Sequence, residues 1–252
     1  MNIHEFGKEN EKIIVLIHPS LVKWDYFEYA IPLLRDKYHL VIPALPGYDP
    51  ETAEEFISVE KTSCEIGRWL RMKRYNDIHL VYGCSMGGSC ALRLAADQMV
   101  HISHVVMDGG ITPYQLPRAV TRLIAVRDFA MMAAGKAGGI KLLEKAFSTD
   151  ELSREDAAYI ADVFRHTTYR TLWNTFDSCN NYSMPENHNS SFPKLHYWYA
   201  AKERKARDWH IRWMKEHFPD TVFREYTDGG HGGLAVYQPE RFAEMIERTA
   251  KV

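Results

Sequence analysis

The sequence predicts an α/β fold in which a mostly parallel, doubly wound sheet carries an inserted helical lid. Three observations lead to this prediction. Buried-strand patterns alternate with segments of helix length, the alternation gives way to a long helical stretch after residue 110, and it resumes at residue 194. Parallel neighbours need a long crossover connection, so the alternation favours a parallel sheet with helices on both faces. A chain of 252 residues suits one such core with one insertion.

Six short apolar runs are expected to be the strands of this sheet. Continuous apolar runs of this length fill strands that are buried on both faces. In chain order they are KIIVLIH at 12–18, YHLVIPAL at 38–45, DIHLVYG at 77–83, HISHVVMDGG at 101–110, KLHYWYAA at 194–201 and TVFREYT at 221–227.

Segments with apolar residues at helical spacing lie between these runs. They cover 24–38, 59–75, 206–218 and about 239–250, and long helical patterns fill much of 111–193. We therefore interpret 1–110 and 194–252 as one core and 111–193 as a helical lid. Turn-forming residues at 178–193 indicate a loop that returns the chain to the core.

Composition and charge exclude several classes of function. Lys plus Arg number 31 and Asp plus Glu number 33, so no global field attracts polyanions and no nucleic-acid partner is expected. No apolar run approaches the roughly 18 residues that span a bilayer, so no stable membrane insertion is expected. The four cysteines lack metal-ligand spacing, and the first residues are polar and acidic, which favours a reduced, cytoplasmic protein. Nothing in the sequence predicts the oligomeric state.

The stretch VYGCSMGGSCALRLA at 81–95 places Ser85 between glycines where a strand should give way to a helix. This G-x-S-x-G pattern, with a strand before it and a helix after it, is typical of a sharp turn that exposes a nucleophilic serine. The start of the helix offers free N–H groups and a positive dipole end to a developing oxyanion. Ser85 is therefore the candidate nucleophile.

A serine hydroxyl needs a base that takes its proton and later returns it. His231 lies in TDGGHGG at 227–233, a glycine-rich loop between the last strand and the last helix. A parallel sheet brings this loop to the same edge as Ser85, so His231 is the candidate base. Asp228 is too close in sequence to be an independent partner of His231 and is expected to be a turn residue.

The imidazole needs a carboxylate from another strand end to orient it. Glu203 follows the strand at 194–201, and Asp108 ends the strand at 101–110. Glu203 sits among basic residues and is also explained by a surface ion pair, whereas Asp108 is also explained by a turn or helix cap. Glu203 is the first candidate for the triad acid, and Asp108 is the alternative.

These residues resemble the α/β-hydrolase superfamily, in its branch of lidded serine esterases, lipases and peptidases. The resemblance rests on the order Ser85, acid, His231, on the GCSMGG turn, and on IHPS and PALPGYDP near the first strands. It implies that the backbone N–H of Met86 and that of Ser20 or Leu21 form an oxyanion hole. Pro19 stands where that family usually has glycine, so the shape of the loop at HPS is open. The segment YWYAAKER is similar to the family's acid-bearing segment, which favours Glu203.

The resemblance implies a serine hydrolase that cleaves a carboxylic ester or related acyl substrate through an acyl-enzyme. No metal or organic cofactor is expected, and the expected partner is a small-molecule acyl substrate. Two alternatives use the same residues: a receptor on the same fold that hydrolyses its ligand slowly or not at all, and an acyltransferase or carbon-carbon bond hydrolase. In the lid, Tyr114, Trp173 and Phe176 are candidates for lining the substrate pocket, although aromatic residues at helical spacing often pack a lid onto its core.

Overall fold

A computed structural model describes residues 1–114, 116–138, 154–185, 192–227 and 230–251. Its sheet has seven strands in the order β1-β3-β2-β4-β5-β6-β7. The strand bounds are β1 Ile3–Phe6, β2 Ile13–Ile17, β3 His39–Pro43, β4 Asp77–Cys84, β5 His101–Asp108, β6 Lys194–Ala200 and β7 Val222–Tyr226. Only β1 is antiparallel to its neighbour, β3, and the other pairs are parallel. The predicted fold class is confirmed, and all six predicted strands are present.

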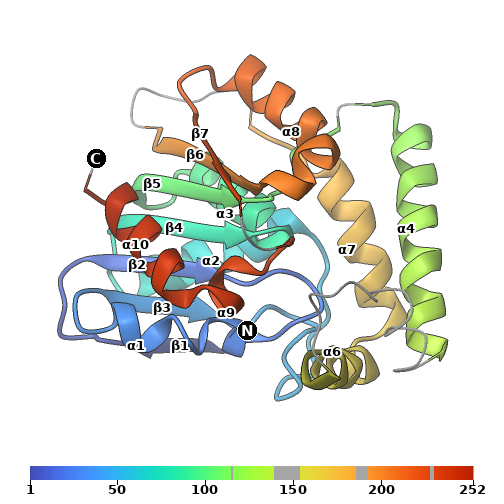
Figure 1. The fold of residues 1–252 in the computed structure, drawn as a ribbon, viewed down its shortest axis with the longest axis horizontal. Helices are drawn as coiled ribbons and strands as arrows, with labels where there is room; N and C mark the ends of the chain where they lie inside the picture. The colour runs from blue at the N-terminus through green and yellow to red at the C-terminus, as the bar shows by residue number, and fades with distance from the viewer. Residues whose placement is uncertain (115, 139–153, 186–191, 228–229, 252) are drawn as a thin grey trace.

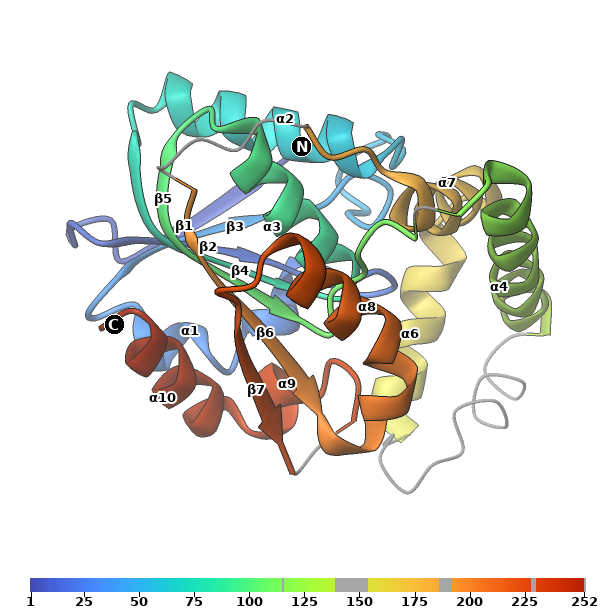
Figure 2. The same ribbon diagram turned by 90° about the horizontal axis from the view of Figure 1, so that it is seen from above.

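Helices cover both faces of the sheet, as the alternation predicted (Figure 2). One apolar core lies between the sheet and α2 (Val59–Met72), α3 (Met86–Asp97) and α8 (Arg204–His217). The other lies between the sheet and the short helices η1 (Trp24–Phe27) and α1 (Ile31–Leu34), together with α9 (Leu234–Tyr237) and α10 (Pro239–Thr249). Strands β2 to β4 are therefore buried from both sides, which explains their uninterrupted apolar sequences.

The segment 24–38 differs from its prediction as one continuous helix. It forms η1 and α1, separated by a turn in which the Ala30 N–H donates to the Phe27 carbonyl at 2.9 Å. Pro32 lies in the first turn of α1, where its missing N–H costs nothing, but a helix running on from η1 would need that donor. Strand β1 and helix α9 were not predicted, since four-residue elements are too short to show a period.

Three helices lie between β5 and β6 in the described part of the insertion: α4 (Arg118–Gly138), α6 (Arg154–His166) and α7 (Tyr169–Asn181). In Figure 1 they stand on the side toward which the arrows of β4 and β5 point. Helix α7 packs on the loop after β3, where the Tyr48 and Thr175 hydroxyls are 2.7 Å apart and the Val59 N–H donates to Ser178 Oγ at 2.8 Å. The assignment of 1–110 and 194–252 to a core and 111–193 to a lid stays a prediction.

Some predicted features fall on residues outside the described ranges. These are the end of the first lid helix pattern, at 139–147, residues 186–191 of the loop expected at 178–193, and Asp228. Among the helices that the structure describes, none is both long and apolar enough to cross a membrane.

Candidate active site

Ser85 occupies a strained turn between β4 and α3. Its φ is 52° and its ψ is −117°, a backbone conformation that residues other than glycine rarely adopt. Of the residues from Val81 to Leu92, only Ser85 is not buried. Its side chain makes no capping hydrogen bond to the helix that it precedes. Ser85 is therefore partly exposed at the point where the backbone turns, which is the placement that the G-x-S-x-G pattern predicts.

Two glycines allow the turn to close. A Cβ on Gly83 would lie 2.0 Å from the Gly87 carbonyl oxygen, so the strand and the helix approach too closely for a side chain. A Cβ on Gly87 would lie 2.3 Å from the carbonyl oxygen of Ile17, at the end of β2. The first turn of α3 therefore sits directly against the segment that leads into the loop at 18–23, which we call the oxyanion loop.

His231 is paired with Glu203. Its Nδ1 lies 2.8 Å from Glu203 Oε1, and its side chain is 39% exposed while that of Glu203 is 11% exposed. A carboxylate only accepts hydrogen bonds, so this contact requires the proton on Nδ1. Nε2 is then an acceptor, and Arg207 Nη2 lies 3.5 Å from it. The ring lies against Gly109, where a Cβ would be 2.9 Å from both Nδ1 and Cε1. The backbone carbonyl of the preceding residue, Asp108, accepts a hydrogen bond from the Ser85 N–H at 2.9 Å, so the histidine and the turn meet at the end of β5.

Glu203 is held as a carboxylate. Burial opposes its ionisation, but the hydrogen bond and charge of His231 and the guanidinium of Arg207 outweigh burial and lower the pKa of Glu203 to about 2. Arg207 Nη2 and Nε donate to the same Oε1 at 2.7 and 3.2 Å. Nη2 also lies 3.0 Å from His231 Nδ1. The predicted ion pair of Glu203 is thus real, and it coexists with the contact to His231.

Asp108, the alternative acid, is placed differently. It is buried, and its two carboxylate oxygens accept hydrogen bonds from Tyr82 and Tyr226 at 2.7 and 3.0 Å. Burial raises the pKa of Asp108, and both tyrosine hydroxyls oppose this effect. Both of its oxygens are therefore engaged in the core, whereas Glu203 Oε1 contacts the imidazole.

The oxyanion loop begins at His18, which is fully buried. Its Nε2 accepts from the Leu45 N–H at 3.0 Å, and its Nδ1 donates to the Pro19 carbonyl at 2.7 Å. Burial lowers the pKa of His18 to about 4, which suits a neutral ring with one donor and one acceptor. Leu21 has a φ of 68°, so the backbone turns sharply there. Gly87 of α3 lies against the carbonyl groups of Ile17 and His18, just before this turn. Ser20, Leu21 and Met86 are thus on neighbouring segments, and their role as oxyanion donors stays a prediction.

The three aromatic candidates have different surroundings. The Tyr114 ring lies 5.4 Å from that of Trp209 and 5.6 Å from that of His210, and both of these residues are on α8. Trp173 packs edge-on against Phe129 of α4 at 5.6 Å, a contact within the insertion. Phe176 is half-buried on α7. Substrate binding by these residues stays a prediction.

Sequence reasoning did not assign a role to Arg207 or His18. Arg207 follows Glu203 by four residues, so an i,i+4 ion pair was the available signal, but that spacing alone does not reveal the contact with His231. His18 was visible only within the IHPS motif, and its hydrogen bond to the Leu45 amide depends on the packing of two loops.

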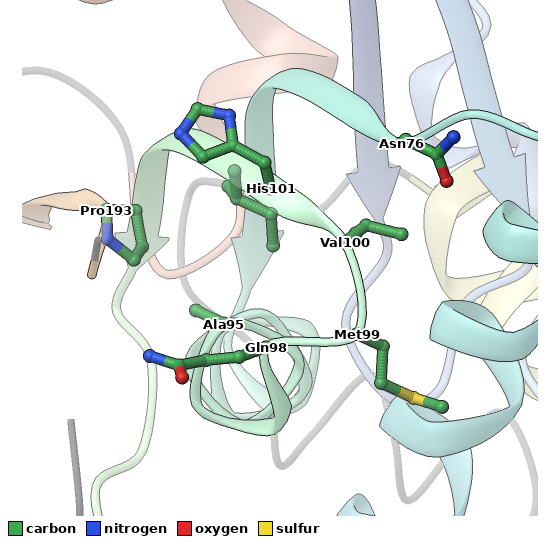
Figure 3. A pocket seen from close by; sticks show the side chains of 8 residues that line it. Asn76, Ala95, Gln98, Met99, Val100, His101 and Pro193 are labelled. Atoms are coloured by element: carbon green, nitrogen blue, oxygen red, sulfur yellow. The ribbon is translucent and has the colours of Figure 1, made fainter. Parts of the chain in front are cut away.

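A pocket of about 330 Å³ lies elsewhere (Figure 3). It is lined by residues 98–102 at the start of β5, together with Asn76, Ala95 and Pro193. This is the opposite edge of the sheet from Ser85, so the pocket is separate from the candidate active site.

Comparisons with known proteins agree with this fold. The model of the alpha/beta hydrolase family matches residues 14–245. MenH from S. aureus is a similar structure, with 18% identity, a TM-score of 0.77, and coverage of 99% of this chain and 97% of that one. A structure from work on carboxylesterases of the thaumarchaeon Nitrososphaera gargenis is 17% identical, with a TM-score of 0.77 and coverage of 99% and 94%. An esterase from Thermogutta terrifontis is 15% identical, with a TM-score of 0.71 and coverage of 98% and 91%. At these identities the structural likenesses show the fold alone.

Proposed function

The chain belongs to the alpha/beta-hydrolase family, and on that premise we propose that it is a serine hydrolase that cleaves a carboxylic ester or related acyl bond. The observation that carries the proposal is the 2.8 Å contact between Glu203 Oε1 and His231 Nδ1. The His231 ring lies against Gly109, at the end of β5, and the strained turn of Ser85 is hydrogen-bonded to the residue before that glycine. The proposed nucleophile, base and acid follow three different strands, β4, β7 and β6, and a triad for acyl transfer needs these three roles at one edge of the sheet.

In the proposed reaction, Ser85 Oγ attacks the acyl carbonyl while His231 Nε2 takes its proton. His231 then gives that proton to the leaving alcohol, and a water molecule, activated in the same way, hydrolyses the acyl-enzyme. Glu203 keeps the imidazole in the productive tautomer and stabilises its charged form. The N–H groups of Met86 and of Ser20 or Leu21 bind the oxyanion, and each such donor typically lowers the barrier by about 3 to 4 kcal/mol.

The helical insertion is proposed to cap this site. Its helices stand on the side of the sheet where the strand carboxyl ends lie (Figure 1). Tyr114, whose ring lies near those of Trp209 and His210 on α8, is proposed to contact substrate, and Trp173 and Phe176 are proposed to line the lid side. We also propose a cytoplasmic location, which the four free cysteines suit.

Similar structures support ester chemistry without fixing the bond that is cleaved. Three of them are described as esterases or carboxylesterases, and others as an epoxide hydrolase and a bromoperoxidase. The contact of His231 Nδ1 with Glu203 leaves Nε2 as the proposed base for Ser85, which favours acyl transfer. The choice of ester over amide, and of water over another acceptor, is therefore the part that an activity assay must decide.

A graded series of 4-nitrophenyl esters, from acetate to decanoate, tests the proposed function. We expect turnover of at least one ester at about 1 to 10³ s⁻¹, a usual range for enzymes, and a clear optimum of chain length. Aminoacyl arylamides should be poorer substrates. Adding alcohols or thiols should leave the carboxylic acid as the main product. Ester transfer to the acceptor in place of hydrolysis would identify an acyltransferase, and no turnover of any ester would contradict the proposal.

A further inference from the structure

Helix α6 contacts the oxyanion loop through Tyr159. The Tyr159 hydroxyl accepts a hydrogen bond from the Lys23 N–H at 2.9 Å and donates one to Asp25 Oδ1 at 2.5 Å. Lys23 Nζ lies 3.0 Å from the other oxygen of Asp25 and 5.1 Å from the centre of the Tyr159 ring. One side chain of the insertion thus holds both the backbone and the side chains at the end of this loop.

Leu21 is held by the same helix through apolar contacts. Its φ of 68° is unfavourable for a residue with a side chain, so the surrounding structure must maintain it. Its side chain packs on an apolar cluster that joins α6 and α7, with Ala161, Phe164 and Leu172 at the centre. The backbone from Leu21 to Lys23 is therefore fixed at both ends by the helical insertion.

The contacts continue to the loop that bears His231. Tyr26, one residue beyond Asp25, donates a hydrogen bond to the Gly232 carbonyl at 2.8 Å. On α6 itself, Asp156 accepts a hydrogen bond from the Tyr237 hydroxyl of α9 at 2.8 Å. Asp156 and Tyr159 are three residues apart and so lie on one face of the helix. That face of α6 joins the oxyanion loop to the segment after His231.

We propose that Tyr159 is a positioning residue for the oxyanion hole. It would act through Lys23 and Asp25, holding the loop so that the N–H of Ser20 or Leu21 faces the oxyanion. The inference rests on the proposed function, because it assigns a role within the same site. Without the Tyr159 hydroxyl, the Lys23 N–H loses its acceptor, and the loop can relax out of the left-handed conformation at Leu21.

The test is Tyr159→Phe, which keeps the ring and removes only the hydroxyl. With a neutral 4-nitrophenyl ester we expect kcat to fall about 10- to 100-fold while KM stays within about 2-fold, because the oxyanion forms only along the reaction path. The Ki of a trifluoromethyl ketone, whose adduct with Ser85 carries an oxyanion, should rise by the factor by which kcat/KM falls. Tyr169→Phe is the matched control, since Tyr169 lies at the start of α7, is 49% exposed, and contacts Lys136.

A second variant covers the case in which Tyr159→Phe does not fold. Leu21→Gly keeps the backbone N–H but removes the side chain that packs on the cluster between α6 and α7. Glycine also gives the backbone freedom to leave its present conformation, so we expect the same selective loss of kcat. The proposal is overturned if the folded variants keep kcat and the ketone Ki, or if only KM rises. A fluorophosphonate that labels Ser85 in the wild-type protein shows that the proposed function holds even if the role of Tyr159 is overturned. A wild-type protein that is not labelled shows that the proposed function itself has failed.

Discussion

Replacing Ser85 with alanine is expected to lower kcat for ester hydrolysis by about 10⁴- to 10⁶-fold, since loss of the nucleophile removes the covalent route altogether. Stability should change little. Serine and alanine share the Cβ that strains the turn, and the Ser85 side chain caps no helix end. The free energy of unfolding should therefore stay within about 0.5 kcal/mol of the wild-type value, as measured by urea denaturation.

Ser63→Ala is a matched control for this variant. Ser63 is buried on α2, and its hydroxyl donates to the Cys90 carbonyl at 2.9 Å, away from the reacting groups. Removing that hydrogen bond should cost about 1 kcal/mol of stability and leave kcat unchanged. If Ser85→Ala kept more than a small fraction of wild-type kcat, the nucleophile would have to be another group.

Replacing Glu203 with alanine is expected to lower kcat by about 10⁴-fold. Once the carboxylate is gone, Arg207 Nη2, which is 3.0 Å from His231 Nδ1, becomes the neighbouring hydrogen-bond donor. Nδ1 would then act as the acceptor and the proton would move to Nε2, the tautomer that cannot deprotonate Ser85. Glu203→Gln should lose less, about 10²-fold, because Arg207 and His231 together favour an amide oxygen at the position of Oε1.

Asp108→Asn distinguishes the two candidate acids. Asp108 accepts hydrogen bonds from Tyr82 and Tyr226, so an amide there disturbs a buried network and should cost about 1 to 3 kcal/mol of stability. We expect kcat to stay within about 10-fold of wild type. Steady-state kinetics of the Glu203 and Asp108 variants, each checked for folding, decide the matter. A large loss of kcat at Asp108 with a small one at Glu203 would transfer the role of the acid to Asp108.

Much of the fold was predictable because strands buried on both faces have a simple signature. The uninterrupted apolar runs before Ser85 and Asp108 placed β4 and β5, and the glycines around Ser85 indicated the turn between β4 and α3. His231 could be chosen as the candidate base because a glycine-rich loop after the last strand of a parallel sheet must lie at the carboxyl edge. These features depend on local sequence and on one topological rule.

Other features depend on contacts between segments far apart in the chain. Tyr159 meets Lys23 across more than a hundred residues, and no local pattern marks either as a partner. The choice between Glu203 and Asp108 likewise depends on which carboxylate contacts the imidazole, since both residues lie at strand ends. The division of 24–38 into η1 and α1 was not predicted. The apolar residues of this segment have the spacing of one continuous helix, and the prediction followed that spacing although Pro32 indicates a break.

Reaction with a fluorophosphonate probe, followed by mass spectrometry of the labelled peptide, tests the central claim most directly. The wild-type protein should gain one covalent adduct, and the adduct should lie on Ser85. Labelling should be abolished in Ser85→Ala and strongly slowed in Glu203→Ala, because attack on phosphorus needs the same base. A wild-type protein that remains unlabelled, or that carries the adduct on another residue, would contradict the proposal that Ser85 is an activated nucleophile.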